Sequence, residues 1–475
     1  MLFEKQTFLV AGLSRSGIAS AEFLRARGAT VFLYDDVDSE TVQDARKRLE
    51  VLGCTSFSKE ELERSAAQCD CLVLSPGIPI DHPLALSFRR AKKRILGEAE
   101  LGALALRCPA VGITGTNGKT TTVTMLESIL KEAGKNAVSC GNVGKPITSC
   151  LEELGESGVA VAEISSFQLE TLTSFRPHVA IVLNVTEDHL NRHYTLENYI
   201  YLKSRILKNC TESEYAVLNY DDPVVRSFAE RTKAHIVWFS AFERVEGGYL
   251  AEGYFYFQGE RVCAEEELSI GGEHNRMNAL AAICAAKLFG VENTAIAAAL
   301  KNFRGVKHRL QRIGEIGGVT FIDDSKATNV DSAVKAIKSV RGESVLLLGG
   351  KDKGYSYEPL FDELKNSGIV QAVIYGENAF RILNAAVKCG FTAITLVRPF
   401  DMAVRVAYML AKKGQSVLLS PASASFDCFK SYEERGDRFA QLFEEFCAES
   451  AFEVAAVSEE SKGKLSARAE ELFEE

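Results

Sequence analysis

The feature that most constrains this chain is a glycine-rich loop between an apolar strand and a helix. Residues 112–122 read GITGTNGKTTT, and an apolar run enters the loop from residue 110. Apolar side chains at helical spacing follow within 123–130. Glycines let backbone N–H groups crowd around an anion, and a helix start adds partial positive charge. The pattern predicts an ATP site in which Lys119 reaches the terminal phosphates and Thr120 offers a hydroxyl to Mg²⁺. The alternative is an ordinary strand-to-helix turn.

Length and charge narrow the possible functions. At 475 residues the chain exceeds a single core, and 46% hydrophobic with 25% charged residues is typical of a soluble globular protein. The net charge of −9 argues against general nucleic-acid binding and against anchoring on anionic lipid. No signal peptide precedes the first strand and no apolar run is long enough to span a bilayer. We therefore expect a cytoplasmic protein without nucleic-acid or membrane partners.

The N-terminal segment has the pattern of a Rossmann-like domain. Apolar strands at 7–11 and 30–34 enclose a helical stretch that opens with a glycine-containing turn. Ser14 stands where dinucleotide-binding loops have their middle glycine, and its Cβ obstructs a pyrophosphate, so we expect another nucleotide diphosphate. A buried strand from residue 71 ends at Ser75-Pro76-Gly77, which is either a ligand loop or only a turn. The candidate contacts to this ligand are Arg15, Ser16, Asp35, Ser75 and Gly77.

Polar side chains also follow two apolar strands of the central segment. Glu163 lies near the carboxyl end of the strand 159–164, and the strand 179–183 leads into Asn184-Val185-Thr186-Glu187-Asp188-His189. Because both strand ends are expected at the sheet edge that carries the phosphate loop, Glu163 is a candidate Mg²⁺ ligand. His189 belongs to the same composite site, although a lone histidine there is more often structural.

Two further residues have open alternatives. Lys203 lies at the centre of the apolar face of a predicted helix, 196–207. It either extends to water or is held inside, where desolvation lowers the pKa of its amine and makes it reactive. Asn275 precedes the alanine-rich helix 279–289 and either caps it or contacts an adenine edge.

A new series of strands begins after residues 303–309, which resemble a linker. Strands at 319–323, 344–348, 372–375 and 416–419 each end in polar residues, as expected of a third α/β domain. The tail beyond residue 448 is acidic with few apolar residues, and we assign it no chemistry.

Taken together, these motifs resemble the Mur ligase family, in particular its D-glutamate-adding members. The stretches that carry the resemblance are 115–120, 163–169, 184–190, 323–329 and 419–427. The resemblance implies an α/β protein of three domains: a Rossmann-like UDP-substrate domain (1–97), a P-loop ATPase-like ligase domain (98–305) and a Rossmann-like amino-acid domain (306–448), followed by the acidic tail (449–475).

The resemblance also implies an activity. It is an ATP-dependent amide ligation that adds D-glutamate to UDP-N-acetylmuramoyl-L-alanine through an acyl phosphate, in peptidoglycan precursor synthesis. The cofactors implied are ATP, two Mg²⁺ ions and a carbamylated lysine at Lys203. We expect a monomer.

Residue roles follow from matching the family's motifs. The nucleotide contacts implied are Gly115, Thr116, Asn117, Gly118, Lys119, Thr120, Thr121, Asn275, Arg309 and Asp324. Thr120 and Glu163 belong to one metal, and His189 and carbamylated Lys203 to the second. Asn142 matches a contact to the uridine substrate. The D-glutamate pocket implied is Lys326, Thr328, Lys353, Ser425, Phe426 and Tyr432. The catalytic set implied is Lys119, Glu163, His189, Lys203 and Lys326.

Three other functions compete with this interpretation. A sister amide ligase would use the same phosphate loop with another amino acid. A nicotinamide dehydrogenase would use the turn at 12–17, and a nucleotide-binding regulator would need no metal or lysine set.

Overall fold

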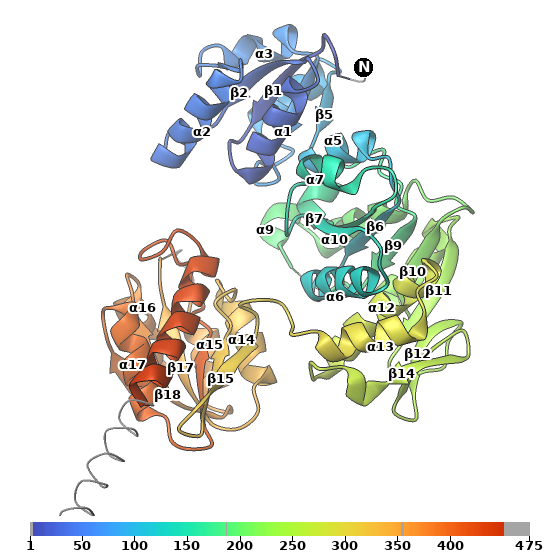
Figure 1. The fold of residues 1–475 in the computed structure, drawn as a ribbon. Coiled ribbons are helices and arrows are strands. Elements are labelled where there is room, and N and C mark those ends of the chain that lie inside the picture. The colour runs from blue at the N-terminus through green and yellow to red at the C-terminus, as the bar shows by residue number, and fades with distance from the viewer. Residues whose placement is uncertain (1–2, 187, 353–355, 451–475) are drawn as a thin grey trace, which may run out of the picture. The chain divides into compact units, whose positions relative to one another are not determined.

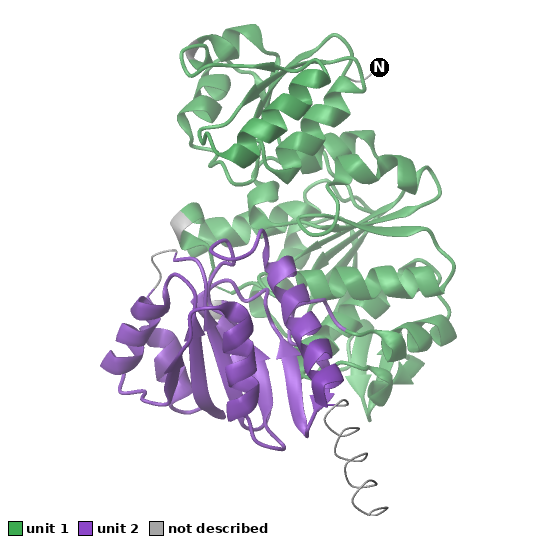
Figure 2. Cartoon of the chain, turned by 60° about the vertical axis from the view of Figure 1, so that its left-hand side comes forward, with its two compact units in different colours: residues 1–304 green, residues 305–475 purple. Residues whose placement is uncertain are grey.

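The computed structural model describes residues 3–186, 188–352 and 356–450, which form three β-sheets with flanking helices (Figure 1). The chain divides into two compact units, residues 1–304 and 305–475 (Figure 2). The predicted α/β class is confirmed, because most neighbouring strands are parallel. Each sheet falls inside one of the three predicted domains, whose boundaries remain predictions.

The first sheet is entirely parallel, in the order β3-β2-β1-β4-β5. Its elements are β1 (Thr7–Ala11), α1 (Arg15–Arg25), β2 (Thr30–Tyr34), α2 (Glu40–Val51), β3 (Thr55–Ser56), α3 (Leu62–Gln68), β4 (Cys71–Leu74), α4 (Pro83–Arg90) and β5 (Arg94–Leu96). The central strands β1 and β4 are buried on both faces, which explains their continuous apolar runs. The strand order reverses between them, so the turns after β1 and β4 form the crevice where such sheets bind ligands.

The second sheet has nine strands, in the order β14-β13-β12-β11-β10-β9-β6-β8-β7. The elements up to its phosphate loop and beyond are α5 (Glu98–Ala105), β6 (Ala110–Thr114), α6 (Lys119–Glu132), β7 (Ala137–Gly141), α7 (Ile147–Leu154), β8 (Val159–Glu163), α8 (Ser166–Leu169), β9 (Val179–Val182), α9 (Leu190–His193) and α10 (Leu196–Ser204). The remainder are β10 (Tyr215–Asn219), α11 (Pro223–Arg226), β11 (His235–Ser240), β12 (Gly247–Ala251), β13 (Tyr254–Phe257), β14 (Glu260–Ala264), α12 (Glu273–Leu288) and α13 (Asn293–Asn302). The carboxyl ends of β6, β8 and β9 lie side by side, which brings the predicted loops to one edge.

Two apolar layers cover the second sheet. On one face α6 packs against α12 and α13 (Figure 1), and the alanines of α12 allow this close approach. The other face is covered by a cluster that includes Cys140, Cys150 and Tyr199. Helix α12 begins at Glu273, earlier than the predicted 279, because its first turn is polar and lacks the apolar period.

The third sheet has the order β15-β16-β20-β17-β18-β19 and is parallel except for the edge strand β15. Its elements are β15 (Gln311–Ile316), β16 (Val319–Asp323), α14 (Val330–Ser339), β17 (Ser344–Gly349), α15 (Glu358–Leu364), β18 (Ile369–Tyr375), α16 (Ala379–Lys388), β19 (Ile394–Leu396), α17 (Phe400–Leu410) and β20 (Ser416–Leu419). Apolar clusters cover both faces. The strand order reverses around β20, so the turns after β16, β17 and β20 meet at one edge.

In the part of the chain that the structure describes, no helix is long and apolar enough to cross a membrane.

Candidate active site

The phosphate loop leaves the carboxyl end of β6 and leads directly into α6. The helix begins at Lys119, four residues before the apolar pattern starts at residue 123, because its first turn is polar. Gly118 has a φ of +84°, and a Cβ there would lie 2.2 Å from Oδ1 of Asn278, so the position requires glycine. The N–H of Asn117 donates to Oδ1 of Asn184 at 2.8 Å, and the N–H of Thr116 donates to the Asn184 carbonyl at 2.9 Å. The loop is therefore held against the end of β9.

Two lysines meet at one carbonyl of this loop. Nζ of Lys119 donates to the carbonyls of Gly115 (2.9 Å) and Thr116 (3.0 Å), and Nζ of Lys203 donates to the same Gly115 oxygen at 2.8 Å. Lys203 is only 1% exposed, so the alternative that it extends to water is wrong. Burial, and then the charge of Lys119, holds the pKa of Lys203 well below its usual value. This shift is toward the neutral form of the amine.

Glu163 lies buried behind the loop at the end of β8. Its Oε2 accepts from the Thr120 hydroxyl at 2.8 Å, and its Oε1 accepts from the side-chain amide of Asn142 at 2.7 Å. The carbonyl of Asn142 in turn accepts from Arg15, the first residue of α1, at 3.0 Å. The structure therefore brings together four predicted site residues from the first and second of the predicted domains.

His189 begins α9 in the left-handed region, with a φ of 53°. Its ring lies 4.9 Å from that of Phe167, and Nε2 lies 3.5 Å from a carboxylate oxygen of Asp188. Burial, with smaller contributions from Lys119 and Lys203, lowers the pKa of His189, while Asp188 opposes the shift. A neutral imidazole has the lone pair that a metal requires.

Three residues hold the loop without having been assigned a role of their own from the sequence, although Asn184 belongs to the polar stretch predicted there. Tyr199 places its hydroxyl 3.2 Å from that of Thr116, and Asn184 binds the loop backbone. Asn278, 4% exposed, lies 3.3 Å from the Thr122 hydroxyl and contacts the predicted nucleotide residue Asn275 at 3.4 Å. The Asn275 amide also donates to the Gly271 carbonyl at 2.7 Å, which is a local turn contact. Asn278 ends the polar stretch before the alanine run of α12, so the sequence gives no signal that separates it from the polar residues before it.

The predicted substrate residues of the first sheet surround the turn after β1. Asp35 accepts from the N–H of Leu13 at 2.7 Å, so its carboxylate closes this turn. Ser75 lies 3.3 Å from Ser14, hydroxyl to hydroxyl. Gly77 is exposed and Ser16 is half-buried. These residues share one edge of the sheet.

In the second unit, Asp324 follows β16 and is 4% exposed. It accepts from the Ser420 hydroxyl at 2.8 Å and from the N–H of Leu310 at 3.2 Å. Burial raises the pKa of Asp324 to about 7, although Ser420 and the charge of Arg309 oppose this. Arg309 itself is exposed.

The predicted amino-acid pocket draws on the turns after β16 and β20. Nζ of Lys326 lies 5.8 Å from the ring centre of Tyr432, and Thr328 is half-buried two residues further on. Ser425 is 2% exposed and Phe426 is 65% exposed. Lys353 lies outside the described residues.

A buried arginine that the sequence interpretation missed holds these two turns together. Arg435 is fully buried and donates to the Ser325 hydroxyl (2.9 Å), the Ser325 carbonyl (2.8 Å) and the Ser423 carbonyl (3.1 Å). A single charged residue in a helical run gives no sign of burial in the sequence, because only the folded chain encloses it.

The donor set fits one divalent cation directly. A buried carboxylate beside the hydroxyl of a phosphate loop, Glu163 with Thr120, offers the oxygen ligands that Mg²⁺ prefers. Among the described residues, no three His, Cys, Asp or Glu side chains gather as a metal cluster. A second ion near His189 would therefore need further oxygens, which an ammonium at Lys203 does not offer and a carbamate would.

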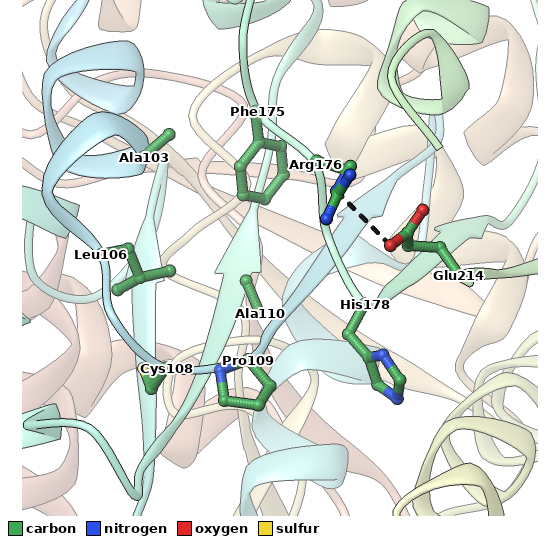
Figure 3. A pocket seen from close by; sticks show the side chains of 9 residues that line it. All are labelled: Ala103, Leu106, Cys108, Pro109, Ala110, Phe175, Arg176, His178 and Glu214. Carbon is green, nitrogen blue, oxygen red and sulfur yellow. Dashed lines mark ion pairs between the residues drawn. The ribbon is translucent and has the colours of Figure 1, made fainter. Parts of the chain in front are cut away.

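A hollow of about 280 Å³ lies at the end of the central sheet opposite to the phosphate loop (Figure 3). Pro109, His178 and Glu214 line it at the starts of β6, β9 and β10, and Arg176 pairs with Glu214 at 3.4 Å. The amino ends of parallel strands face away from the loops at their carboxyl ends. This hollow is therefore not part of the phosphate site.

Comparison with known proteins gives matches to both compact units. Residues 113–286 match the Mur ligase middle domain, and residues 308–423 match the Mur ligase glutamate ligase domain. The UDP-N-acetylmuramoylalanine–D-glutamate ligase of Caldanaerobacter subterraneus subsp. tengcongensis is 42% identical over 92% of this chain and 98% of its own. That of Streptococcus mutans is 39% identical over 93% of this chain and 97% of its own.

Solved structures share the fold at lower identity. UDP-N-acetylmuramate-alanine ligase MurC from Thermotoga maritima has a TM-score of 0.58 at 19% identity, covering 93% of this chain and 99% of its own. MurF ligase from Thermotoga maritima, in complex with ADP, has a TM-score of 0.54 at 18% identity, covering 93% and 95%.

Proposed function

The chain belongs to the Mur ligase family, and from this premise we propose that it joins D-glutamate to UDP-N-acetylmuramoyl-L-alanine with ATP, in peptidoglycan precursor synthesis. The relatives named for this activity match it over more than nine-tenths of both chains. The observation that carries the proposal is the series of contacts Arg15–Asn142–Glu163–Thr120. It connects the substrate crevice of the first sheet with the phosphate loop, as transfer from ATP to a bound substrate requires.

The reaction has two steps. A carboxylate oxygen of the alanyl group attacks the γ-phosphorus of ATP, the bond to ADP breaks, and an acyl phosphate forms. The amine of D-glutamate then attacks the acyl carbon, a proton is lost from nitrogen, and inorganic phosphate leaves as the amide forms. Positioning and charge stabilisation supply most of such catalysis.

The phosphate loop performs the first step. Lys119 binds the β- and γ-phosphates, and the loop N–H groups with Gly115, Gly118 and Thr121 enclose them. Glu163 and Thr120 would hold one Mg²⁺ and His189 the other, and the ions would neutralise charge on the transferred phosphoryl group. Asn275, Arg309 and Asp324 would contact the rest of the nucleotide.

Lys203 would serve as a carbamate. Its position supports this, because it is buried beside Lys119 at the phosphate loop, where a permanent second ammonium would be costly. A neutral amine reacts with CO₂, and the carbamate oxygens would complete the second metal site.

The third sheet would hold D-glutamate. Two lysines and two hydroxyls, on Lys326, Lys353, Thr328 and Ser425, suit an amino acid with two carboxylates, since each carboxylate needs several donors once it leaves water. Phe426 and Tyr432 would enclose the side chain. A site for lysine would need an acidic group for the distal ammonium.

We further propose a cytoplasmic monomer. ATP and nucleotide-activated precursors are cytoplasmic metabolites, and a single chain supplies every residue assigned above.

The test is phosphate release with ATP, UDP-N-acetylmuramoyl-L-alanine and one amino acid at a time. We expect turnover with D-glutamate and a rate lower by up to about 10⁴ with D-glutamine, because buried donors would lose their partner. Equal rates with D-glutamine or L-lysine would refute the pocket, and no release with any of them would refute the ligase.

The carbamate has its own test. Lys203→Ala should lose activity and recover part of it with short carboxylates, which can replace carbamate oxygens at a metal. Mass spectrometry of the native protein at high bicarbonate should show the added CO₂. Absence of both effects would refute the modification.

A further inference from the structure

We propose that Arg192 is a positioning residue that holds the substrate loop of the first sheet against the ATP site, an inference that rests on the proposed function. Arg192 lies on α9, one turn after His189. Its guanidinium donates to the carbonyl of Ile78 at 2.9 Å and to that of Gly77 at 3.4 Å. Both carbonyls belong to the turn after β4, which lines the proposed UDP-substrate crevice.

The same guanidinium is also bound to the central domain, at the residue that follows α8. Nε and Nη2 of Arg192 donate to the two carboxylate oxygens of Glu170, at 3.1 Å and 2.6 Å. Glu170 is the residue after α8, the helix that follows the proposed metal ligand Glu163. The Arg192 and Glu170 side chains are 12% and 7% exposed, so water screens the pair little. One side chain thus joins three segments that belong to both halves of the site.

The surroundings keep this pair in one geometry. The ring centre of Phe167 lies 5.1 Å from the guanidinium carbon of Arg192. In the buried His193 ring, Nδ1 lies 3.4 Å from Oε1 of Glu170 and Nε2 lies 3.0 Å from the Ser166 hydroxyl. Burial, and then the charge of Arg192, lowers the pKa of His193 to about 4, so the ring stays neutral near pH 7. Glu170 therefore has Arg192 as its charged partner there.

The hydrogen bonds of Arg192 matter because a hollow of about 200 Å³ lies beside them, between the loops of the first sheet and the central domain. The hollow is lined by Ile80 and Asp81 from the first sheet's loops and by Tyr194 from the central domain, whose hydroxyl donates to Asp81. Apolar packing does not fill this gap, so directed hydrogen bonds must set the loop position. Arginine suits the task because its planar fork binds a carboxylate and carbonyls at once, which a lysine ammonium does less well.

The experiment compares Arg192→Ala and Arg192→Lys with a matched arginine in the full-length chain. The control is Arg205→Ala, because Arg205 donates to the carbonyls of Leu169 and Leu172 in the same segment, and none of its hydrogen bonds to the described residues reaches the first sheet. KM for UDP-N-acetylmuramoyl-L-alanine, ATP and D-glutamate is measured by phosphate release, with the melting temperature of each variant.

We expect Arg192→Ala to raise KM for the UDP substrate about tenfold or more, the factor for losing a hydrogen bond to a charged group. KM for ATP should stay within about twofold, and Arg192→Lys should recover part of the loss. Arg205→Ala should lower the melting temperature without this selective change.

Equal increases in all three KM values, or the same selective change in Arg205→Ala, would overturn the inference. If Arg192→Ala does not fold, Arg192→Lys is compared with Glu170→Gln. Arg192→Lys should raise KM for the UDP substrate more, because Glu170→Gln leaves the contacts of Arg192 with the loop in place. An inactive wild type refutes the proposed function and the inference with it, whereas an active wild type with an unaffected Arg192→Ala refutes the inference alone.

Discussion

At the scale of single residues, burial shifts the pKa of one basic and one acidic side chain, each toward its neutral form. Lys203 is pushed toward its neutral amine and Asp324 toward its neutral acid, because each is enclosed with few compensating charges. Lys119 differs, since it is half-buried and donates to two carbonyls of the phosphate loop. We propose that its role is charge rather than packing.

Lys119→Ala should therefore reduce turnover by about 10²–10³, the usual effect of losing one preorganised donor. The melting temperature should change little. The matched control is Lys131→Ala on the same helix, because the exposed Lys131 side chain pairs with Glu127 at 2.8 Å, away from the loop. Phosphate-release assays on both variants decide, and near-normal turnover in Lys119→Ala would contradict the assignment of the phosphate loop.

Asp324 should give the second unit a pH-dependent stability. In the folded chain, burial raises the pKa of this carboxyl from its usual value of 3.8 to about 7. Between these values the folded chain holds a proton that the unfolded chain lacks, so this contribution to stability falls as pH rises from about 4 to about 7. Asp324→Asn should remove this pH dependence. The measurement is the free energy of unfolding in urea, for wild type and variant, at about pH 5 and about pH 8. The exposed Asp362→Asn is the control, and an unchanged pH dependence in Asp324→Asn would contradict the buried acid.

At the scale of elements, the phosphate loop and α6 form one functional piece. Glycines with positive φ flank α6 at both ends: Gly118, at +84°, precedes the helix, and Gly134, at +73°, follows it. A Cβ at Gly118 would strike Asn278, whereas a Cβ at Gly134 meets nothing within 4 Å. The two glycines therefore share the backbone requirement and differ in the space around them.

Alanine at these two glycines should separate strain from function. Each substitution places an L-residue at positive φ, at a cost of about 1–2 kcal/mol. Gly134→Ala should show this loss of stability alone and keep its affinity for ATP. Gly118→Ala should also lose ATP binding, measured by calorimetry, because the loop must shift away from Asn278. Equal ATP affinities in the two variants would show that the loop tolerates the added carbon.

At the scale of the whole molecule, three sheets are organised as two compact units. The apolar cluster of the first sheet includes Leu101 of α5, and Leu151 of α7 packs against this cluster. Buried Glu98 also accepts from the N–H and hydroxyl of Thr148, at 2.7 Å and 2.8 Å. The third sheet has clusters of its own on both faces.

These cores predict which fragments fold alone. Residues 305–450 should give a cooperative unfolding transition and dispersed amide resonances, because their apolar faces are covered from within. Residues 98–304 should bind a hydrophobic dye and aggregate, since removing the first sheet exposes the cluster around Leu101. Residues 1–304 are the control and should fold. A well-folded 98–304 fragment would contradict the shared core.

Local pattern was enough for much of this fold. The strands 7–11, 30–34, 319–323 and 416–419 occur with the predicted bounds, because apolar runs bounded by turn residues are buried strands. The phosphate loop and its helix follow from glycine spacing, which is a property of adjacent residues. The polar residues at strand ends could be assigned to one edge because parallel strands share their direction.

Only the tertiary structure decided which of these residues touch. Lys203 reaches Gly115 across 88 residues, and Arg192 reaches Ile78 across 114. Helix spacing placed Lys203 on an apolar face but left open whether it reached water, since that depends on what covers the face. Arg192 showed no pattern at all, because its partners are backbone carbonyls, which every residue type has. Contacts made by the backbone, and burial imposed by distant elements, are set by packing and leave no local trace in the sequence.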